Sequence, residues 1–391
     1  MNLPTPNASL PLSGIRVLEF SHTIMGPSCG VILADLGADV IKVEPPEGEP
    51  TRRSAGFAAG FFPYFNRNKR SLTADLKSPA GLELIRSLLA ETDVLIENYA
   101  PGTMERLGLG YDALAQRHPR LIYCALKGFL SGPYERRPAL DEIVQFMTGL
   151  AYMTGPPGRP LRAGASVVDI LGGAFGAIAI LAAIHERERT ARGGLVKSAL
   201  FESSAFLVGQ HMAGEAVVGE PAPPMPARGA AWGIYETYET AEGGDVFIGV
   251  TSDHHWQRFC HAFGLEDLLA DETLHDNTGR VAAKERLKER VGAVIRTLPA
   301  REVCERCERA EIPFSPVSTP SDLFDDPQLN AGIGMMDTRL ADGSHAKLPR
   351  LPIEIGAHEF GLRRQPPTLG EHNAEIIAEN QVSHAAADAR R

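Results

Sequence analysis

The feature that most constrains the fold is an alternation of strand and helix patterns over the first 130 residues. Four short runs of β-branched and other apolar residues predict strands, at residues 15–20, 39–44, 93–97 and 121–125. Helical patterns lie between them, at 27–36 and at 79–91, the second with Ser78 as its predicted N-cap. This alternation favours an α/β fold, a Rossmann-like, mostly parallel sheet with helices on both faces. Ligands of such sheets bind beyond the carboxyl ends of the strands.

The rest of the chain predicts a second, smaller domain, which a length of 391 residues allows. Helices are expected at 140–152 and 167–188, and a proline-rich segment at 220–226 reads as a linker. A hairpin at 233–250 and helices at 254–263 and 281–297 would follow it. The predicted domains are therefore a large domain at 1–226, a small α+β domain at 227–320, and a segment at 321–391 that returns to the large domain.

Charge and composition exclude several classes of protein. A formal net charge of −10 argues against nucleic-acid binding, which requires a basic face. The longest apolar run, 170–184, is too short to span a bilayer, and the N-terminus lacks the pattern of a signal peptide. Five scattered cysteines fit reduced thiols, and Cys304 and Cys307 have no second pair to complete a metal site. We therefore expect a cytoplasmic protein without metal, membrane or nucleic-acid partners.

Asp169 is the strongest single candidate for chemistry. No GxGxxG motif follows the first strand, which disfavours a nicotinamide-dependent dehydrogenase. A carboxylate in the first turn of a helix is stabilised by the helix dipole, by about 0.3–1 kcal/mol, and carboxylates act as covalent nucleophiles in some enzymes. Taken alone, however, the spacing of Ser166 and Asp169 favours a capping box, in which the aspartate only satisfies a backbone N–H.

Sequence motifs along nearly the whole chain change that balance. They occur, in order, at 12–20, 26–27, 36–44, 68–71, 93–99, 101–102, 106–108, 162–164, 169, 312–313, 316–317, 326–327 and 369–373. In order and spacing they resemble the class III CoA-transferases of the CaiB/BaiF type, the family that includes formyl-CoA transferase. The resemblance implies that Asp169 attacks an acyl-CoA thioester and forms a mixed anhydride, then an aspartyl-CoA thioester. It also implies coenzyme A and acyl-CoA as substrates, no permanently bound cofactor, no ATP or metal, and an interlocked homodimer.

The resemblance also assigns a CoA site. It implies that His22, Thr23 and Met25 line the pantetheine and thioester. It places four further residues near the adenine and phosphates, namely Lys77, Asn98, Tyr99 and Arg106. The chain departs from formyl-CoA transferase at Ile24, where a glutamine is expected, at Pro45, where an arginine is expected, and at 228–233, which replaces a tetraglycine loop. These departures argue against a small, oxalate-type acceptor.

Two alternatives share parts of this pattern. An α-methylacyl-CoA racemase has the same fold but needs a histidine beside the substrate α-carbon, where this chain has Leu140 followed by Asp141. A non-catalytic CoA-binding protein would have no use for Asp169. Arginines are numerous in the loops expected near the site: Arg52, Arg53, Arg136, Arg137, Arg159 and Arg162. They favour a dicarboxylic substrate such as succinate, with Arg137 and Asp141 as candidate substrate-binding residues and succinyl-CoA as a candidate donor.

Overall fold

The computed structural model describes residues 10–229, 231–332 and 334–388, which form two compact units. The first unit contains the described residues up to Pro226 together with those from Pro327 onward, and the second unit is Ala227–Asp326. The first boundary coincides with the end of the proline-rich segment. The second lies at Asp326, whereas the sequence pattern had placed it at residue 320.

The first unit is built on a six-stranded, fully parallel sheet with the strand order β3-β2-β1-β4-β5-β6. Its strands are β1 (Arg16–Phe20), β2 (Asp39–Glu44), β3 (Arg70–Thr73), β4 (Val94–Glu97), β5 (Ile122–Lys127) and β6 (Gly194–Ala199). This order is that of the Rossmann fold, so the predicted fold class is confirmed. The sequence pattern missed β3 and β6, because both are edge strands with polar or charged residues and β3 has only four residues.

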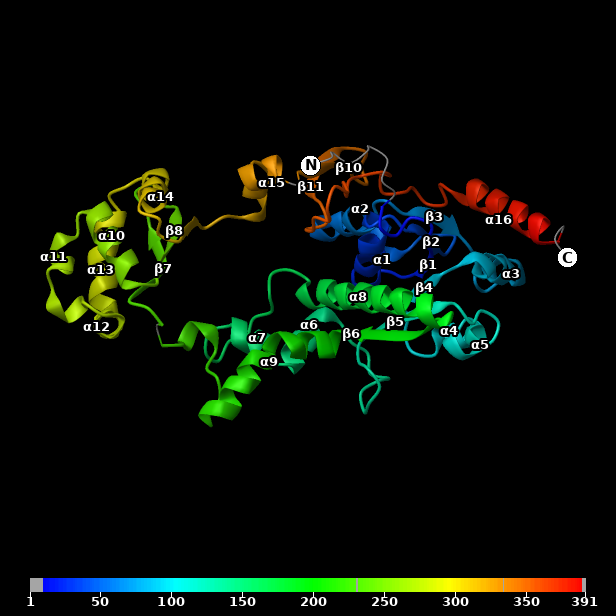
Figure 1. The fold of residues 1–391 in the computed structure, drawn as a ribbon, viewed down its shortest axis with the longest axis horizontal. Helices are drawn as coiled ribbons and strands as arrows, with labels where there is room; N and C mark the ends of the chain where they lie inside the picture. The colour runs from blue at the N-terminus through cyan, green and yellow to red at the C-terminus, as the bar shows by residue number, and fades with distance from the viewer. Residues whose placement is uncertain (1–9, 230, 333, 389–391) are drawn as a thin grey trace. The chain divides into compact units, whose positions relative to one another are not determined.

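Helices cover both faces of this sheet (Figure 1). They are α1 (Met25–Asp35), α2 (Phe61–Phe65), α3 (Pro79–Leu88), α4 (Thr103–Arg106), α5 (Tyr111–Ala115), α6 (Asp141–Met147), α7 (Leu150–Thr154), α8 (Val167–Thr190) and α9 (Leu200–Val218). Successive strand residues face opposite cores: Val17 packs in the cluster that contains α1 and α8, and Leu18 in the cluster that contains α3. Burial on both faces explains why these strands read as continuous apolar runs.

One predicted helix is divided into two in the structure, and one predicted helix cap is confirmed. Ser78 accepts a hydrogen bond from the Gly81 backbone N–H, as expected of an N-cap. The helix expected at 140–152 is instead two short helices, α6 and α7, because Gly149 adopts a left-handed conformation with φ of +82° between them. Glycine adopts this conformation without the steric penalty of a Cβ atom.

Helix α8 is longer than the apolar run that predicted it. An 18-residue window of this 24-residue helix has a mean hydropathy of 2.3, which by length and composition alone is sufficient to cross a membrane, and a third of that window is buried. The buried side packs against α1 through glycines: a Cβ atom on Gly173 would lie 2.6 Å from the Met25 carbonyl oxygen. On its other side Ile178 is 58% exposed. One side of α8 is therefore a core surface of the first unit.

The second unit is a three-stranded antiparallel sheet, with the order β7-β8-β9, packed against helices. Its elements are β7 (Ile234–Glu239), β8 (Asp245–Val250), α10 (Asp253–Phe263), α11 (Glu266–Leu269), α12 (Asn277–Ala282), α13 (Lys284–Ile295), α14 (Ala300–Arg309) and β9 (Phe314–Pro316). The predicted hairpin is β7–β8. The third strand, β9, was missed because its three residues are too few to show a period.

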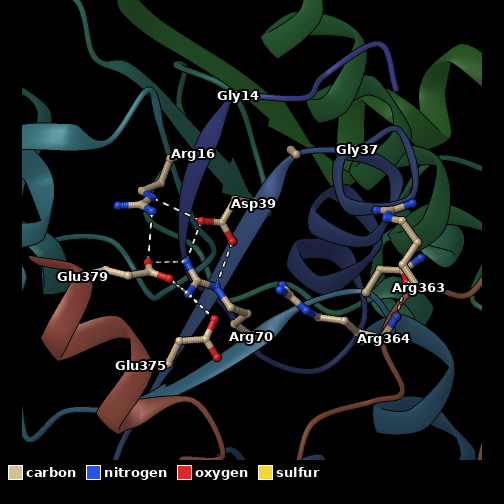
Figure 2. Close-up of a pocket in the computed structure, with 11 residues that line it drawn as sticks. Gly14, Arg16, Gly37, Asp39, Arg70, Arg363, Arg364, Glu375 and Glu379 are labelled. Carbon is tan, nitrogen blue, oxygen red and sulfur yellow. Dashed lines mark hydrogen bonds and ion pairs between the residues drawn. The ribbon is translucent and has the colours of Figure 1, made fainter. Parts of the chain in front are cut away.

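The C-terminal segment adds α15 (Pro327–Ala331), the hairpin β10 (Met335–Arg339) and β11 (His345–Pro349), and α16 (Asn373–Asp388). Helix α16 is held to the sheet by ion pairs from Arg70 to Glu375 and Glu379, both at 3.0 Å. Figure 2 shows these groups around an open cavity of about 410 Å³ at the amino-terminal edge of the sheet. Because Arg16 and Arg70 are already paired with carboxylates there, the cavity is part of an ionic contact between segments.

Candidate active site

Asp169 lies in the first turn of α8, but it does not form the capping box that its spacing suggested. The Ser166 side chain makes no capping hydrogen bond. Instead, Asp141 at the start of α6 accepts hydrogen bonds from the backbone N–H groups of Val168 (2.9 Å) and Asp169 (3.0 Å) through one oxygen, Oδ2. The capping-box interpretation is therefore wrong, and the Asp169 carboxylate is not used to cap its own helix.

The position of Asp141 is itself fixed by a residue that the sequence analysis did not single out. Gln145 donates from Nε2 to Asp141 Oδ1 at 2.5 Å and accepts from the Ala163 backbone N–H at 2.9 Å. Gln145 thus joins α6 to the segment that leads into α8. Its i+4 spacing from Asp141 on one helix face was the available signal.

The environment of Asp169 raises its pKa to about 7, first through burial and second through the negative charge of Asp141. Among the residues that the structure describes, no side chain donates a hydrogen bond to the Asp169 carboxylate. A carboxylate with neither a counter-ion nor a donor is poorly stabilised as an anion. Once ionised, it is therefore suited to attack an electrophile.

The loop after β1 brings three of the predicted CoA-site residues together. The Asn98 side chain accepts from the His22 backbone N–H (3.0 Å) and donates to the His22 carbonyl oxygen (2.9 Å). The His22 ring stacks on Tyr99, with centroids 5.9 Å apart and planes at 19°. Burial lowers the pKa of His22 and raises that of Tyr99 to about 12, so both rings are neutral at physiological pH. Asn98 therefore supports the loop backbone, a role the sequence did not indicate.

Thr23 completes this loop in an uncommon conformation. Its φ is +67°, in the left-handed region that β-branched residues rarely adopt. Its backbone N–H donates to Glu49 Oε2 at 3.2 Å, and its hydroxyl lies 2.8 Å from His22 Nδ1. Backbone strain of this kind costs about 1–3 kcal/mol and persists only where surrounding contacts enforce it.

Met25 connects this loop to the helix that carries Asp169. It begins α1 and is 5% exposed, and its Cε would lie 2.6 Å from a Cβ atom placed on Gly172. Gly172 is three residues beyond Asp169 on α8. The loop and the carboxylate are therefore joined through one tight helix contact, as the predicted site requires.

The remaining predicted residues are more peripheral. Lys77 follows β3 and is exposed, and Arg106 in α4 is exposed and donates to Thr103 Oγ1 at 2.9 Å. Both lie beyond the carboxyl ends of their strands, the edge at which β1 leads to His22, although no hydrogen bond or ion pair joins either of them to His22 or Asp169. Arg137 is exposed in a loop, with its guanidinium 4.9 Å from the centre of the Tyr134 ring.

The structure separates the six candidate arginines into two groups. Arg52 forms a 2.6 Å ion pair with buried Glu44, Arg53 donates to the Glu47 carbonyl, and Arg162 pairs with Glu142 at 3.0 Å. The side chains of the other three make no hydrogen bond or ion pair with the described residues: Arg136, Arg137 and Arg159. Among all the residues that the structure describes, no group of three or more His, Cys, Asp or Glu side chains is arranged to hold a metal ion.

Comparison with known proteins gives the same family as the sequence motifs. Residues 12–373 match the model of CoA-transferase family III. The chain is 36% identical over 390 residues to the succinate–glutarate CoA-transferase of Agrobacterium fabrum, with 96% of each chain covered. It is 32% identical over 386 residues to the succinyl-CoA:mesaconate CoA-transferase of Haloarcula hispanica, which covers 95% of this chain and 96% of that one.

A solved structure supports the same conclusion. The crystal structure of a CaiB/BaiF family protein from Brucella suis superposes with a TM-score of 0.86 at 33% identity, and the match covers 95% of this chain and 100% of that one. The motifs and the strand order now have a common explanation. The chain belongs to CoA-transferase family III.

Proposed function

We propose that this CoA-transferase moves CoA from succinyl-CoA to a free dicarboxylic acid, with Asp169 as the covalent carrier. The observation that carries the proposal is the Asp169 carboxylate, which has no donor or counter-ion among the described residues and is linked through Gly172 and Met25 to the loop of His22 and Thr23. The names of the relatives support the donor and the class of acceptor, since they specify succinyl-CoA, glutarate and mesaconate.

The reaction balances without ATP, a metal or a bound cofactor. A carboxylate oxygen of Asp169 attacks the thioester carbonyl, the C–S bond breaks, and CoA leaves as the thiolate from a mixed anhydride. The thiolate then attacks the aspartyl carbonyl and releases succinate, which leaves an aspartyl-CoA thioester. The acceptor carboxylate then attacks the aspartyl-CoA thioester, which releases the CoA thiolate and forms an anhydride between Asp169 and the acceptor. The thiolate attacks the acceptor carbonyl of this anhydride, which gives the new acyl-CoA and frees Asp169.

The acceptor would be held by its second carboxylate. Arg136, Arg137 and Arg159 are the candidate arginines whose side chains are not engaged by a carboxylate or a carbonyl of the described residues. Arginine binds carboxylates with two parallel hydrogen bonds, which suits recognition of a dicarboxylic acid. Arg137, which rests on the Tyr134 ring, is the residue we assign to this contact.

We further propose a homodimer in which the exposed apolar side of α8 and α9 is covered by a second copy. Large apolar side chains are exposed along these helices and the residues before them: Leu140, Ile143, Phe146, Tyr152, Leu161, Ile170, Ile178, Phe206, Met212, Val217 and Val218. Exposed large apolar side chains gathered along neighbouring elements are typical of a surface that another protein covers. The same contact would cover α8 without a membrane, in keeping with a cytoplasmic enzyme, and a net charge of −10 argues against nucleic-acid partners.

The decisive experiment is capture of the aspartyl-CoA thioester. The protein is incubated with succinyl-CoA, quenched in acid and digested, and the peptide that contains Asp169 is weighed with and without hydroxylamine. We expect a CoA adduct that hydroxylamine removes. It should be absent in Asp169→Ala and present in Asp112→Ala, a matched control in the first turn of α5. No adduct on the wild type would contradict the proposal.

Two further measurements define the substrates and test the alternative. A panel of mono- and dicarboxylic acids, read by the mass of the new thioester, should show turnover with dicarboxylic acids and little with monocarboxylic acids. In heavy water, 2-methylacyl-CoA should gain no α-deuterium above the Asp169→Ala control. Exchange well above that control, without any acceptor acid, would favour the racemase, although Leu140 is an apolar residue that cannot transfer a proton.

A further inference from the structure

Four buried charged side chains lie beneath the loop that follows β1, and the proposed chemistry uses none of them. They are Glu19, Lys42, Glu49 and Lys69, each at most 2% exposed. Lys42 Nζ lies 3.3 Å from Glu19 Oε1 and 3.9 Å from Glu49 Oε1, and Lys69 Nζ lies 2.8 Å from Glu19 Oε2. Two acids and two bases balance in charge. Buried ion pairs contribute little to net stability, so stability alone does not account for this cluster.

Two of these groups bind the loop backbone directly. Lys42 Nζ donates to the Ser21 carbonyl oxygen at 3.0 Å, and Glu49 Oε2 accepts from the Thr23 N–H at 3.2 Å. Between them, Asn98 holds the N–H and the carbonyl of His22. Three successive loop residues are thus fixed by Lys42 of β2, by Glu49 in the segment that follows β2, and by Asn98 directly after β4.

Glu49 is the contact on which the strained residue depends. Thr23 has a φ of +67°, and its N–H donates to Glu49. Glu49 is itself held, since its Oε1 accepts from Thr51 Oγ1 at 2.6 Å and its backbone N–H donates to Glu44 Oε2 at 3.2 Å. A rigid, buried acceptor can enforce a backbone conformation that threonine would otherwise leave.

We propose that Glu49, paired with Lys42, is a positioning residue that holds Thr23 in the conformation that receives the pantetheine and thioester of the acyl-CoA. This inference rests on the proposed function, which assigns the loop to the acyl-CoA. Without Glu49 the loop populates other conformations. The apparent affinity for CoA is then multiplied by the fraction of molecules in which Thr23 keeps the conformation that binds CoA.

The test compares the affinity for free coenzyme A, measured by calorimetry, among matched variants. Glu49→Ala should raise the Kd about 5- to 30-fold, a range that follows from the competent fraction. Glu49→Gln should stay within about twofold, because its amide oxygen can accept from Thr23 while its NH₂ group donates to Thr51 Oγ1. Glu47→Ala removes an exposed carboxylate from the segment after β2 that also carries Glu49, and it should leave the Kd for CoA unchanged.

A double variant separates positioning from ordinary loss of a contact. Glycine adopts a positive φ without strain, so Thr23→Gly should make the loop less dependent on Glu49. The factor by which Glu49→Ala weakens CoA binding should therefore be several-fold smaller in the Thr23→Gly background than in the wild type. An equal factor in both backgrounds would overturn the inference.

The second readout is the pKa of the His22 imidazole, followed by NMR and assigned by loss of its signal in His22→Asn. Burial lowers this pKa, the charge of Glu49 raises it and that of Lys42 lowers it, while the Tyr99 ring covers one face. Glu49→Gln should therefore lower the His22 pKa further while the Kd for CoA stays nearly unchanged. An unchanged pKa would show that the Glu49 carboxylate is not charged beside the His22 ring, which would overturn the pairing of Glu49 with Lys42 on which the inference depends.

Each outcome decides a different statement. If Glu49→Ala binds CoA as tightly as Glu47→Ala, or if the His22 pKa is the same in Glu49→Gln, the inference is wrong. If Glu49→Ala does not fold, Glu49→Asp takes its place in the comparison, because its shorter side chain withdraws the acceptor from the Thr23 N–H. A wild type that binds CoA and shows the Glu49 effects but forms no Asp169 adduct would remove the proposed chemistry and keep the positioning role. A wild type that binds no CoA would remove both.

Discussion

At the scale of single residues, the ionisation of Asp169 determines when the enzyme can react. Because the nucleophile must be a carboxylate and its pKa is raised to about 7, kcat/KM for succinyl-CoA should rise with pH and level off above about 7. Asp141→Asn removes the neighbouring charge, so the midpoint of its kcat/KM profile should lie at a lower pH than that of the wild type. A wild-type profile that is flat from pH 5 to 9 would contradict the assignment.

The same raised pKa has a consequence for stability. A carboxyl group whose pKa is higher in the folded state contributes stability that is fully present below its unfolded pKa and is lost as pH rises through about 7. Asp169→Asn should therefore be more stable than the wild type at pH 8, by about 1–3 kcal/mol, with a smaller difference at pH 5. Urea unfolding at fixed protein concentration measures this, with Asp112→Asn as the control. An equal difference at both pH values would refute the buried-charge explanation.

At the scale of helices, the contact between α1 and α8 sets the distance from the loop to Asp169. A methyl group at Gly173 would lie 2.6 Å from the Met25 carbonyl oxygen and 3.0 Å from the Cys29 backbone nitrogen, and backbone atoms cannot turn aside. Gly173→Ala should therefore destabilise the fold by about 1–3 kcal/mol and lower CoA transfer at least tenfold.

The matched control for that variant is another helical glycine. In α13, a methyl group on Gly292 would meet only the flexible Arg296 side chain, at 3.4 Å. Gly292→Ala should leave transfer unchanged. If both variants behaved alike, the tight helix contact would have no special part in the site.

A second helix contact involves α16. The buried Arg70 guanidinium joins Asp39 on β2 to Glu375 and Glu379, although 300 residues separate it from the two glutamates in sequence. Arg70→Ala should loosen α16 and cost about 1–3 kcal/mol, since it leaves carboxylates without their partner. Amide hydrogen exchange should show faster exchange across α16, while Arg86→Ala, which breaks an exposed 3.8 Å pair on α3, should not. Unchanged exchange would mean that apolar contacts such as Ile376 hold the helix.

The strands and helices show which features a single sequence can predict. Local patterns were sufficient for β1, β2, β4 and β5, whose residues are buried on both faces, and for the cap at Ser78. They were insufficient for β6 and for Glu49, because an edge strand can be polar and a buried acceptor is recognised only by what it contacts. The predicted cap of α8 was wrong for the same reason, because the residue that accepts from the Asp169 N–H is Asp141, which lies 28 residues away in the sequence.

At the scale of the whole molecule, the site is built on a helix whose other side is exposed. Asp169 and Ile170 are neighbours on α8, and Ile170 is 41% exposed. A partner that covers this side would also exclude water from the anhydride, which hydrolysis would otherwise consume. The dimer is therefore expected to affect chemistry as well as stability.

Phe206 offers the sharpest test of that expectation. It is 72% exposed on α9 and packs edge to face on Phe175 of α8, with ring centroids 5.4 Å apart. Phe206→Asp should convert the dimer to a monomer in light scattering, because a buried, unpaired carboxylate is costly at an interface. Transfer should fall with it, and succinyl-CoA should instead be hydrolysed to succinate and CoA, because water then reaches the Asp169 anhydride. Val382→Asp is the control, since Val382 is 70% exposed on α16, away from α9 in the first unit (Figure 1). A monomeric wild type, or a Phe206→Asp dimer with full activity, would show that this side of α8 and α9 is not the interface.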